Sequence, residues 1–178
     1  MVVAGHPLTE RQALEAMLLP SANNVADTTA IWAFGSLQNY QTYANNMVKR
    51  LGLTHTVVGS DASGLNPSTQ STASNLVMLG EIALQHPVIA QVVAMQQTSN
   101  LPVAGVQPNY NRAVTEHGYT GIKLGESDEA GITLLLATNT NFKGKTITFV
   151  SAILGAQRAF APQNSAFTFM ESAKQSLR

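Results

Sequence analysis

The stretch GYTGIKLGESDEAGITLLLATNTNFKGKTITFVSAIL, residues 118–154, decides the fold class of this chain. It predicts three strands, at residues 118–123, 131–138 and 145–154, because apolar and β-branched residues gather there between turn-forming residues. Residues 139–144, NTNFKG, are typical of a hairpin loop between the last two strands. Consecutive strands joined by short polar links predict an antiparallel meander.

The chain before this stretch carries helical signals. Thr9 and Gln12 form a capping-box pattern, and Pro20 stops the first predicted helix. Apolar residues at three- and four-residue spacing predict further helices. We expect these at residues 24–34 and 37–51, after a cap at Ser71 or Thr72, at 87–95 and at 162–177, with loops at 59–67 and 96–114. Helices, a meander and a closing helix predict an α+β fold, and we expect residues 1–178 to form one domain.

Composition excludes several classes of function. Ten basic and ten acidic side chains cancel, which leaves no electrostatic footprint for nucleic acid or for an anionic membrane. The chain has no cysteine, so thiolate catalysis and Cys-ligated zinc are ruled out. Its four histidines are isolated in sequence, and we expect neither a metal nor a cofactor. No stretch approaches the roughly 20 apolar residues that span a bilayer.

Two tripeptides are the candidate site. Ser21-Ala22-Asn23 follows a proline at a predicted helix break, and Lys123-Leu124-Gly125 ends a predicted strand. Each is weak alone, since a Ser-x-Asn after proline is usually a turn or a helix cap. The acidic residues Glu126, Asp128 and Glu129 are interpreted as a solvated loop.

Taken together, the order and spacing of several segments resemble the penicillin-binding D-alanyl-D-alanine carboxypeptidases. The matching segments are LLPSANNVA at 18–26, KRLGL at 49–53, DASGL at 61–65, STA at 71–73, GIKLG at 121–125 and DEAG at 128–131. The resemblance covers roughly residues 5–154 and implies the β-lactamase-like fold of that family, in which a cleft lies between helices and an antiparallel sheet.

The family resemblance also implies a mechanism and site roles. A serine of a Ser-x-x-Lys motif attacks the bond between two terminal D-alanines of a peptidoglycan stem peptide, and β-lactams mimic that substrate. Ser21 would pass protons to the leaving amine, Asn23 would bind the substrate backbone, and Lys123 would add positive charge near Ser21. Gly125 would leave the strand edge without a side chain, so that the substrate can pair along it. The backbone N–H of Glu126 would be an oxyanion donor.

This sequence departs from the family pattern at two places. No serine has a lysine three residues later, so we expect a truncated enzyme that is inactive alone; the alternative is a non-catalytic peptidoglycan-binding relative. Leu124 stands where the family has a hydroxyl that contacts the substrate carboxylate, so we expect weak or no binding of β-lactams. A class A β-lactamase is a third option on the same fold. Such an enzyme would have Asp at the position of Ala22, so the sequence disfavours this option.

The missing Ser-x-x-Lys helix leads to two further expectations. Its absence would leave an uncovered apolar groove, through which the chain could form homo-oligomers. The resemblance implies the cell envelope, and because no secretory segment opens the sequence, we expect an export signal upstream of it.

Overall fold

The structure, a computed structural model, describes residues 3–157 and 162–177. Within these residues, six helices precede a three-stranded sheet and a seventh follows it. The helices are α1 (Glu10–Leu18), α2 (Asn23–Phe34), α3 (Leu37–Arg50), α4 (Ala73–Leu84), α5 (Pro87–Val93), α6 (Arg112–His117) and α7 (Pro162–Gln175). The strands are β1 (Gly121–Ser127), β2 (Gly131–Phe142) and β3 (Lys145–Ala156). This order confirms the predicted α+β class.

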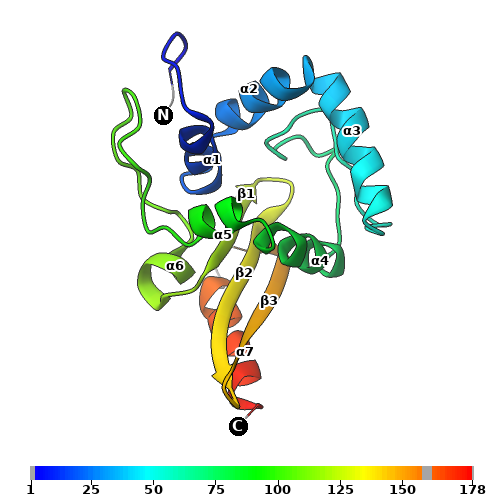
Figure 1. Cartoon of the computed structure of the whole chain (residues 1–178). Helices are drawn as coiled ribbons and strands as arrows, with labels where there is room; N and C mark the ends of the chain where they lie inside the picture. The colour runs from blue at the N-terminus through cyan, green and yellow to red at the C-terminus, as the bar shows by residue number, and fades with distance from the viewer. Residues whose placement is uncertain (1–2, 158–161, 178) are drawn as a thin grey trace.

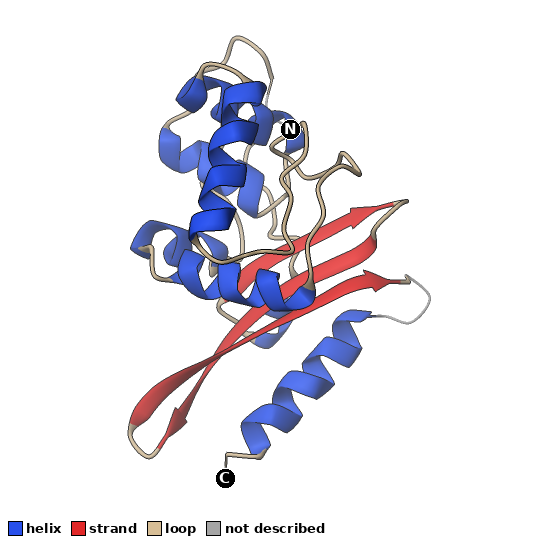
Figure 2. Cartoon of the chain, turned by 90° about the vertical axis from the view of Figure 1, so that its right-hand side faces the viewer, coloured by secondary structure: helices blue, strands red, loops and turns tan. Residues whose placement is uncertain are grey.

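The elements form layers around the sheet. Helices α1, α2 and α3 gather at one end of the molecule, and α4 and α5 lie between them and the sheet (Figure 1). Helix α7 covers the other face of the sheet, as the turned view in Figure 2 shows. The site residues of α2 and β1 therefore come from the helical end and from the sheet.

The sheet is an antiparallel meander with the strand order β1-β2-β3. In the register of its first pair, Lys123 lies opposite Leu135, and Leu124 lies opposite Leu134. Alternate residues of a strand point to opposite faces of the sheet, so Lys123 and Leu124 face different layers of helices. Strand β1 pairs with β2 alone among the described strands, so it is an edge strand of this sheet.

Capping residues set the ends of the helices where the sequence predicted them. The Thr9 side chain accepts from the backbone N–H of Gln12, and the Gln12 side chain accepts from the backbone N–H of Thr9. These two hydrogen bonds complete the capping box of α1. Gly35 ends α2 with a φ of 81°, a left-handed conformation that glycine adopts at little cost. Ser36 and Thr72 cap α3 and α4 through their hydroxyls.

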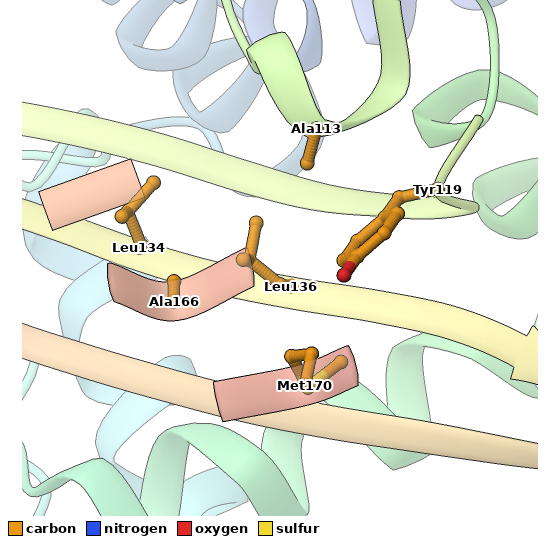
Figure 3. Close-up of a cluster of buried hydrophobic side chains, with 6 residues drawn as sticks. All are labelled: Ala113, Tyr119, Leu134, Leu136, Ala166 and Met170. Atoms are coloured by element: carbon orange, nitrogen blue, oxygen red, sulfur yellow. The ribbon is translucent and has the colours of Figure 1, made fainter. Parts of the chain in front are cut away.

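Apolar side chains cover both faces of the sheet. Between the sheet, α6 and α7 lie Ala113, Tyr119, Leu134, Leu136, Ala166 and Met170, all at most 5% exposed (Figure 3). On the α4 and α5 side, Val93, Ile122 and Ala137 form a second cluster. Burial of each large aliphatic side chain contributes about 1.5–3 kcal/mol, so the sheet is held by the layers above and below it.

Three expectations about the second half of the chain are wrong. Residues 96–114 are not all loop, because Asn111 caps α6 by accepting from the backbone N–H of Ala113. The predicted hairpin loop at 139–144 is a tight turn: β2 runs to Phe142, and Lys143 and Gly144 both have positive φ. Strand β1 begins at Gly121 rather than at Gly118, because Gly118 is the left-handed cap of α6.

Among the described residues, no single helix is long and apolar enough to cross a membrane. Helices α4 and α5 together pass the same test of length and composition, but they are bent by 110° at the break between them. Both pack against the sheet in this structure.

Glycine at position 80 allows α4 to lie against the sheet. A Cβ there would come within 2.9 Å of Ile122 Cδ1 and 3.2 Å of Val150 Cγ1. We expect Gly80→Val to lower the free energy of unfolding by roughly 1–3 kcal/mol, because the added methyl groups overpack this contact. Urea unfolding monitored by circular dichroism measures the loss. The exposed Met78→Val in the same helix is the matched control, and equal effects of the two variants would contradict this close contact.

Candidate functional site

Ser21 lies in the turn that joins α1 to α2. Pro20 ends the first helix, and the backbone N–H of Ala22 donates to the carbonyl of Ala16 at 3.0 Å, closing the turn. Ser21 takes a φ of 60°, in the left-handed region that residues other than glycine rarely adopt. Such strained backbone clusters at functional sites, where the surrounding structure holds it. The turn therefore presents the Ser21 side chain in a fixed, partly exposed position.

Lys123 reaches this turn from the sheet. Its Nζ donates to Ser21 Oγ at 2.7 Å, although the two residues are 102 positions apart in the sequence. The same ammonium also donates to the carbonyl of Leu124. Lys123 and its partner Leu135 point to the face of the sheet that α4 and α5 cover, which is the face toward the helical end. One hydrogen bond thus joins the two tripeptides singled out in the sequence.

The environment of Lys123 changes its acid–base behaviour. Burial desolvates the ammonium and lowers the pKa of Lys123 to about 8. A lysine with such a pKa can both accept and donate a proton near neutral pH, whereas an ordinary lysine stays charged. The Ser21–Lys123 pair can therefore carry a proton as well as a positive charge.

The remaining predicted residues lie close to this pair in the chain. Asn23 is exposed at the first position of α2, two residues after Ser21. Leu124 packs against the cluster between the sheet and α7, so its side chain points away from the face that carries Lys123. Gly125 and Glu126 continue β1 toward the turn, and the Glu126 side chain is exposed.

Two glycines allow close approach around β1. A Cβ at Gly125 would lie 2.7 Å from Thr133 Oγ1 on the neighbouring strand. At the start of the strand, a Cβ at Gly121 would lie 2.8 Å from Val93 Cγ2, so α5 rests directly on β1. These contacts set how closely β1 lies to β2 and to α5, and therefore where Lys123 is placed.

A buried carboxylate that sequence reasoning missed supports the Ser21 turn. Glu15 is 2% exposed and accepts from the backbone N–H of Ser99 at 2.7 Å and from Arg11 Nε at 2.9 Å. Burial acts to raise the pKa of Glu15, but the hydrogen bonds from Ser99 and Arg11 outweigh it, and the net pKa is lowered. The ionised carboxylate ties the 96–111 segment to α1. Nothing in the spacing of α1 residues distinguishes this glutamate from an exposed one.

The same segment also holds the end of α1 through its backbone. The N–H of Tyr110 donates to the carbonyl of Leu19 at 3.1 Å, two residues before Ser21. Asn109 in turn donates to the carbonyl of Met95 at 2.9 Å and accepts from the N–H of Asn111. The hydrogen bond from Tyr110 therefore holds the chain directly before the turn that carries Ser21.

A separate apolar cavity of about 470 Å³ lies between residues 3–10 and α2. Asn24, Thr28 and Trp32 line it from α2, whereas Ser21 and Lys123 do not. Within the described residues, no group of three or more His, Cys, Asp or Glu side chains gathers as a metal site. Asp128 and Glu129 are exposed in the turn between β1 and β2, which agrees with their interpretation as a solvated loop. The interpretation is wrong for Glu126, which is also exposed but belongs to β1 and pairs with Ile132.

Comparison with solved structures identifies the fold. A variant of a DD-transpeptidase from Streptomyces is 22% identical, with a TM-score of 0.81 over 96% of this chain and 70% of its own. A penicillin-binding protein of Listeria monocytogenes, in its cefotaxime-bound form, is 26% identical, with a TM-score of 0.77 over 92% of this chain and 66% of its own. A D-alanyl-D-alanine carboxypeptidase of Francisella tularensis is 18% identical, with a TM-score of 0.82 over 96% and 53%.

This chain thus spans between about half and 70% of the length of these three structures. No curated protein sequence matches it significantly. The family model described as D-alanyl-D-alanine carboxypeptidase matches residues 1–158, which is most of the chain. The fold and this match lead to one conclusion: the chain belongs to the D-alanyl-D-alanine carboxypeptidase family.

Proposed function

We propose that this chain forms the substrate-orienting and proton-relaying side of a serine acyl-transfer site that acts on D-Ala-D-Ala ends of peptidoglycan stem peptides. The observation that carries the proposal is the 2.7 Å hydrogen bond between Lys123 Nζ and Ser21 Oγ. It joins a strand edge, along which an extended peptide can pair, to a hydroxyl that can pass a proton.

Each predicted residue has a role in this proposal. Lys123 supplies positive charge for the terminal carboxylate of the peptide, and Ser21 relays the proton to the departing D-alanine. Asn23 is exposed and available to hydrogen-bond the peptide backbone. Gly125 leaves the strand edge without a side chain, and the backbone N–H of Glu126 is the proposed oxyanion donor.

The nucleophile is the part of the family mechanism that this sequence does not supply. It contains no serine followed three residues later by lysine. We therefore propose that the chain alone binds the stem peptide without releasing D-alanine from it. A non-catalytic peptidoglycan-binding role is the second candidate, and the same absence favours it. Both candidates share the binding step and differ in whether a Ser-x-x-Lys segment acts with this chain.

The family's substrate suggests the setting in which the chain works. Peptidoglycan lies in the cell envelope, and we propose that location for this chain. Self-association through an uncovered groove stays a prediction, since no described contact tests it. Large apolar side chains such as Trp32, which is 74% exposed, are available for it.

The binding proposal can be tested with a diacetylated Lys-D-Ala-D-Ala tripeptide and NMR titration of the chain. We expect shifts in the signals of Ser21, Lys123 and their neighbours. Lys123→Met should weaken binding roughly tenfold or more, because a charged hydrogen bond to the carboxylate is lost. Lys143→Met is the matched control, since that lysine lies in the β2–β3 turn away from the site. Binding that both variants weaken equally, or no binding at all, would overturn the proposal.

Leu124 provides a second test, because its side chain lacks the hydroxyl that the family uses. Because the Leu124 side chain points away from the face that carries Lys123, we expect Leu124→Thr to leave penicillin affinity within roughly twofold of the parent chain. The same change removes apolar contacts with the cluster beside Leu134, so thermal stability should fall. Equilibrium binding and thermal unfolding measure the two effects separately. A roughly tenfold gain in affinity would contradict this placement, since it would mean that the side chain at position 124 reaches the substrate carboxylate.

A further inference from the structure

The Ser21–Lys123 pair has the arrangement of a nucleophile and its base. Ser21 Oγ lies 2.7 Å from Lys123 Nζ, within the range in which a general base takes a proton. Ser21 is partly exposed, so a small acyl donor can reach its hydroxyl. Serine–lysine pairs act as acylating centres on several unrelated folds. The role proposed above for Ser21 uses only its ability to relay a proton.

We propose that Ser21 is itself an acylatable nucleophile, with Lys123 as its general base, and that it reacts with small uncharged activated acyl donors such as aryl esters. This goes beyond the proposed function, in which the nucleophile lies outside this sequence. It depends on the geometry of two residues and not on the binding of a stem peptide.

The burial of Lys123 makes the base available. With its pKa lowered to about 8, roughly half of the molecules carry a neutral amine at pH 8. A lysine with the ordinary pKa of about 10.4 would be neutral in fewer than about 1% of molecules at that pH. In the neutral form the hydrogen bond reverses, and Ser21 Oγ–H donates to the Nζ lone pair. The hydroxyl is then oriented with its oxygen lone pairs free to attack.

The acylation step balances within these groups. Ser21 Oγ attacks the carbonyl carbon of the ester while its proton moves to Lys123 Nζ, and a tetrahedral oxyanion forms. The oxyanion collapses and breaks the bond to the aryloxide, which takes the proton from Nζ and leaves as a phenol. The products are an ester on Ser21 and a neutral Lys123, ready for a second proton transfer to or from water.

Helix α2 can favour the charge that develops in this step. Ser21 precedes α2 by two residues, and the N-cap residue Ala22 makes no side-chain capping bond. The positive end of the helix dipole, carried by backbone N–H groups of its first turn, is therefore not neutralised by a capping side chain. A negative charge beside a helix N-terminus is stabilised, as in sites that bind anions.

The lining of the site selects the acyl donor. The Leu124 side chain packs between the sheet and α7 and supplies no hydroxyl to the face that carries Lys123, so donors that depend on a free carboxylate, such as penicillins, gain little here. An uncharged aryl ester depends only on the reactivity of its carbonyl group. The pair is therefore expected to react with p-nitrophenyl acetate faster than with penicillin.

The test exposes the whole chain to p-nitrophenyl acetate and identifies the acetylated residue by peptide mass spectrometry. We expect an acetyl group on Ser21, which neutral hydroxylamine removes because it is an ester and not an amide. Its rate of formation should rise with pH and level off above a midpoint near 8. Acetylation confined to lysines, or a midpoint near the ordinary lysine pKa, would overturn the proposal. This part of the test needs only the unaltered chain.

Matched variants separate chemistry from folding. Ser21→Ala should abolish the hydroxylamine-sensitive adduct, and Lys123→Arg should slow its formation roughly 100-fold or more, because guanidinium keeps the charge but cannot act as the base. Ser74→Ala and Lys143→Arg, at exposed positions, should leave the rate unchanged. An unchanged adduct in Lys123→Arg would contradict the role of Lys123. Because the readout is covalent, the result is independent of whether a stem peptide binds.

Discussion

The desolvated ammonium of Lys123 is the constraint on which the candidate site depends. An unpaired charge is costly to bury, and the partners that this ammonium finds are the Ser21 hydroxyl and the Leu124 carbonyl. Neither partner is a carboxylate, so the charge is hydrogen-bonded but not neutralised, and its pKa falls. The same bond links the helical end of the molecule to an edge strand of the sheet. The Lys123 side chain therefore serves both in proton transfer and in holding the helical end against the sheet.

The surrounding structure holds that side chain in place from several directions. Glu15 anchors the 96–111 segment to α1, and the carbonyl of Leu19 accepts from that segment just before Ser21. On the sheet side, Gly121 lets α5 rest on β1, and Gly80 lets α4 approach the strands closely. Small residues at the contacts with the sheet and a buried carboxylate on α1 thus support the two elements that carry Lys123 and Ser21.

Much of this arrangement could be predicted from the sequence. Capping residues and glycines gave most helix ends, because these signals act over three or four residues. The two tripeptides were found by their order and spacing, and the structure brings Ser21 and Lys123 together. The short helix α6 was missed because it has six residues, too few for a periodic pattern. The tight turn at Lys143 was missed because polar residues 139–141 belong to a strand whose exposed end tolerates them. Burial of Glu15 was not predictable, since it depends on a segment more than 80 residues away.

The most direct test of this account is an NMR titration of the lysine Cε resonances, with the Lys123 signal assigned by its loss in Lys123→Met. The account predicts that Lys123 titrates with a midpoint near 8, since its ammonium is buried without a carboxylate partner. Unperturbed lysine side chains, which titrate with a midpoint of about 10.4, are the reference. A Lys123 midpoint that coincides with theirs would mean that the ammonium is hydrated and that the Ser21 contact does not form in solution.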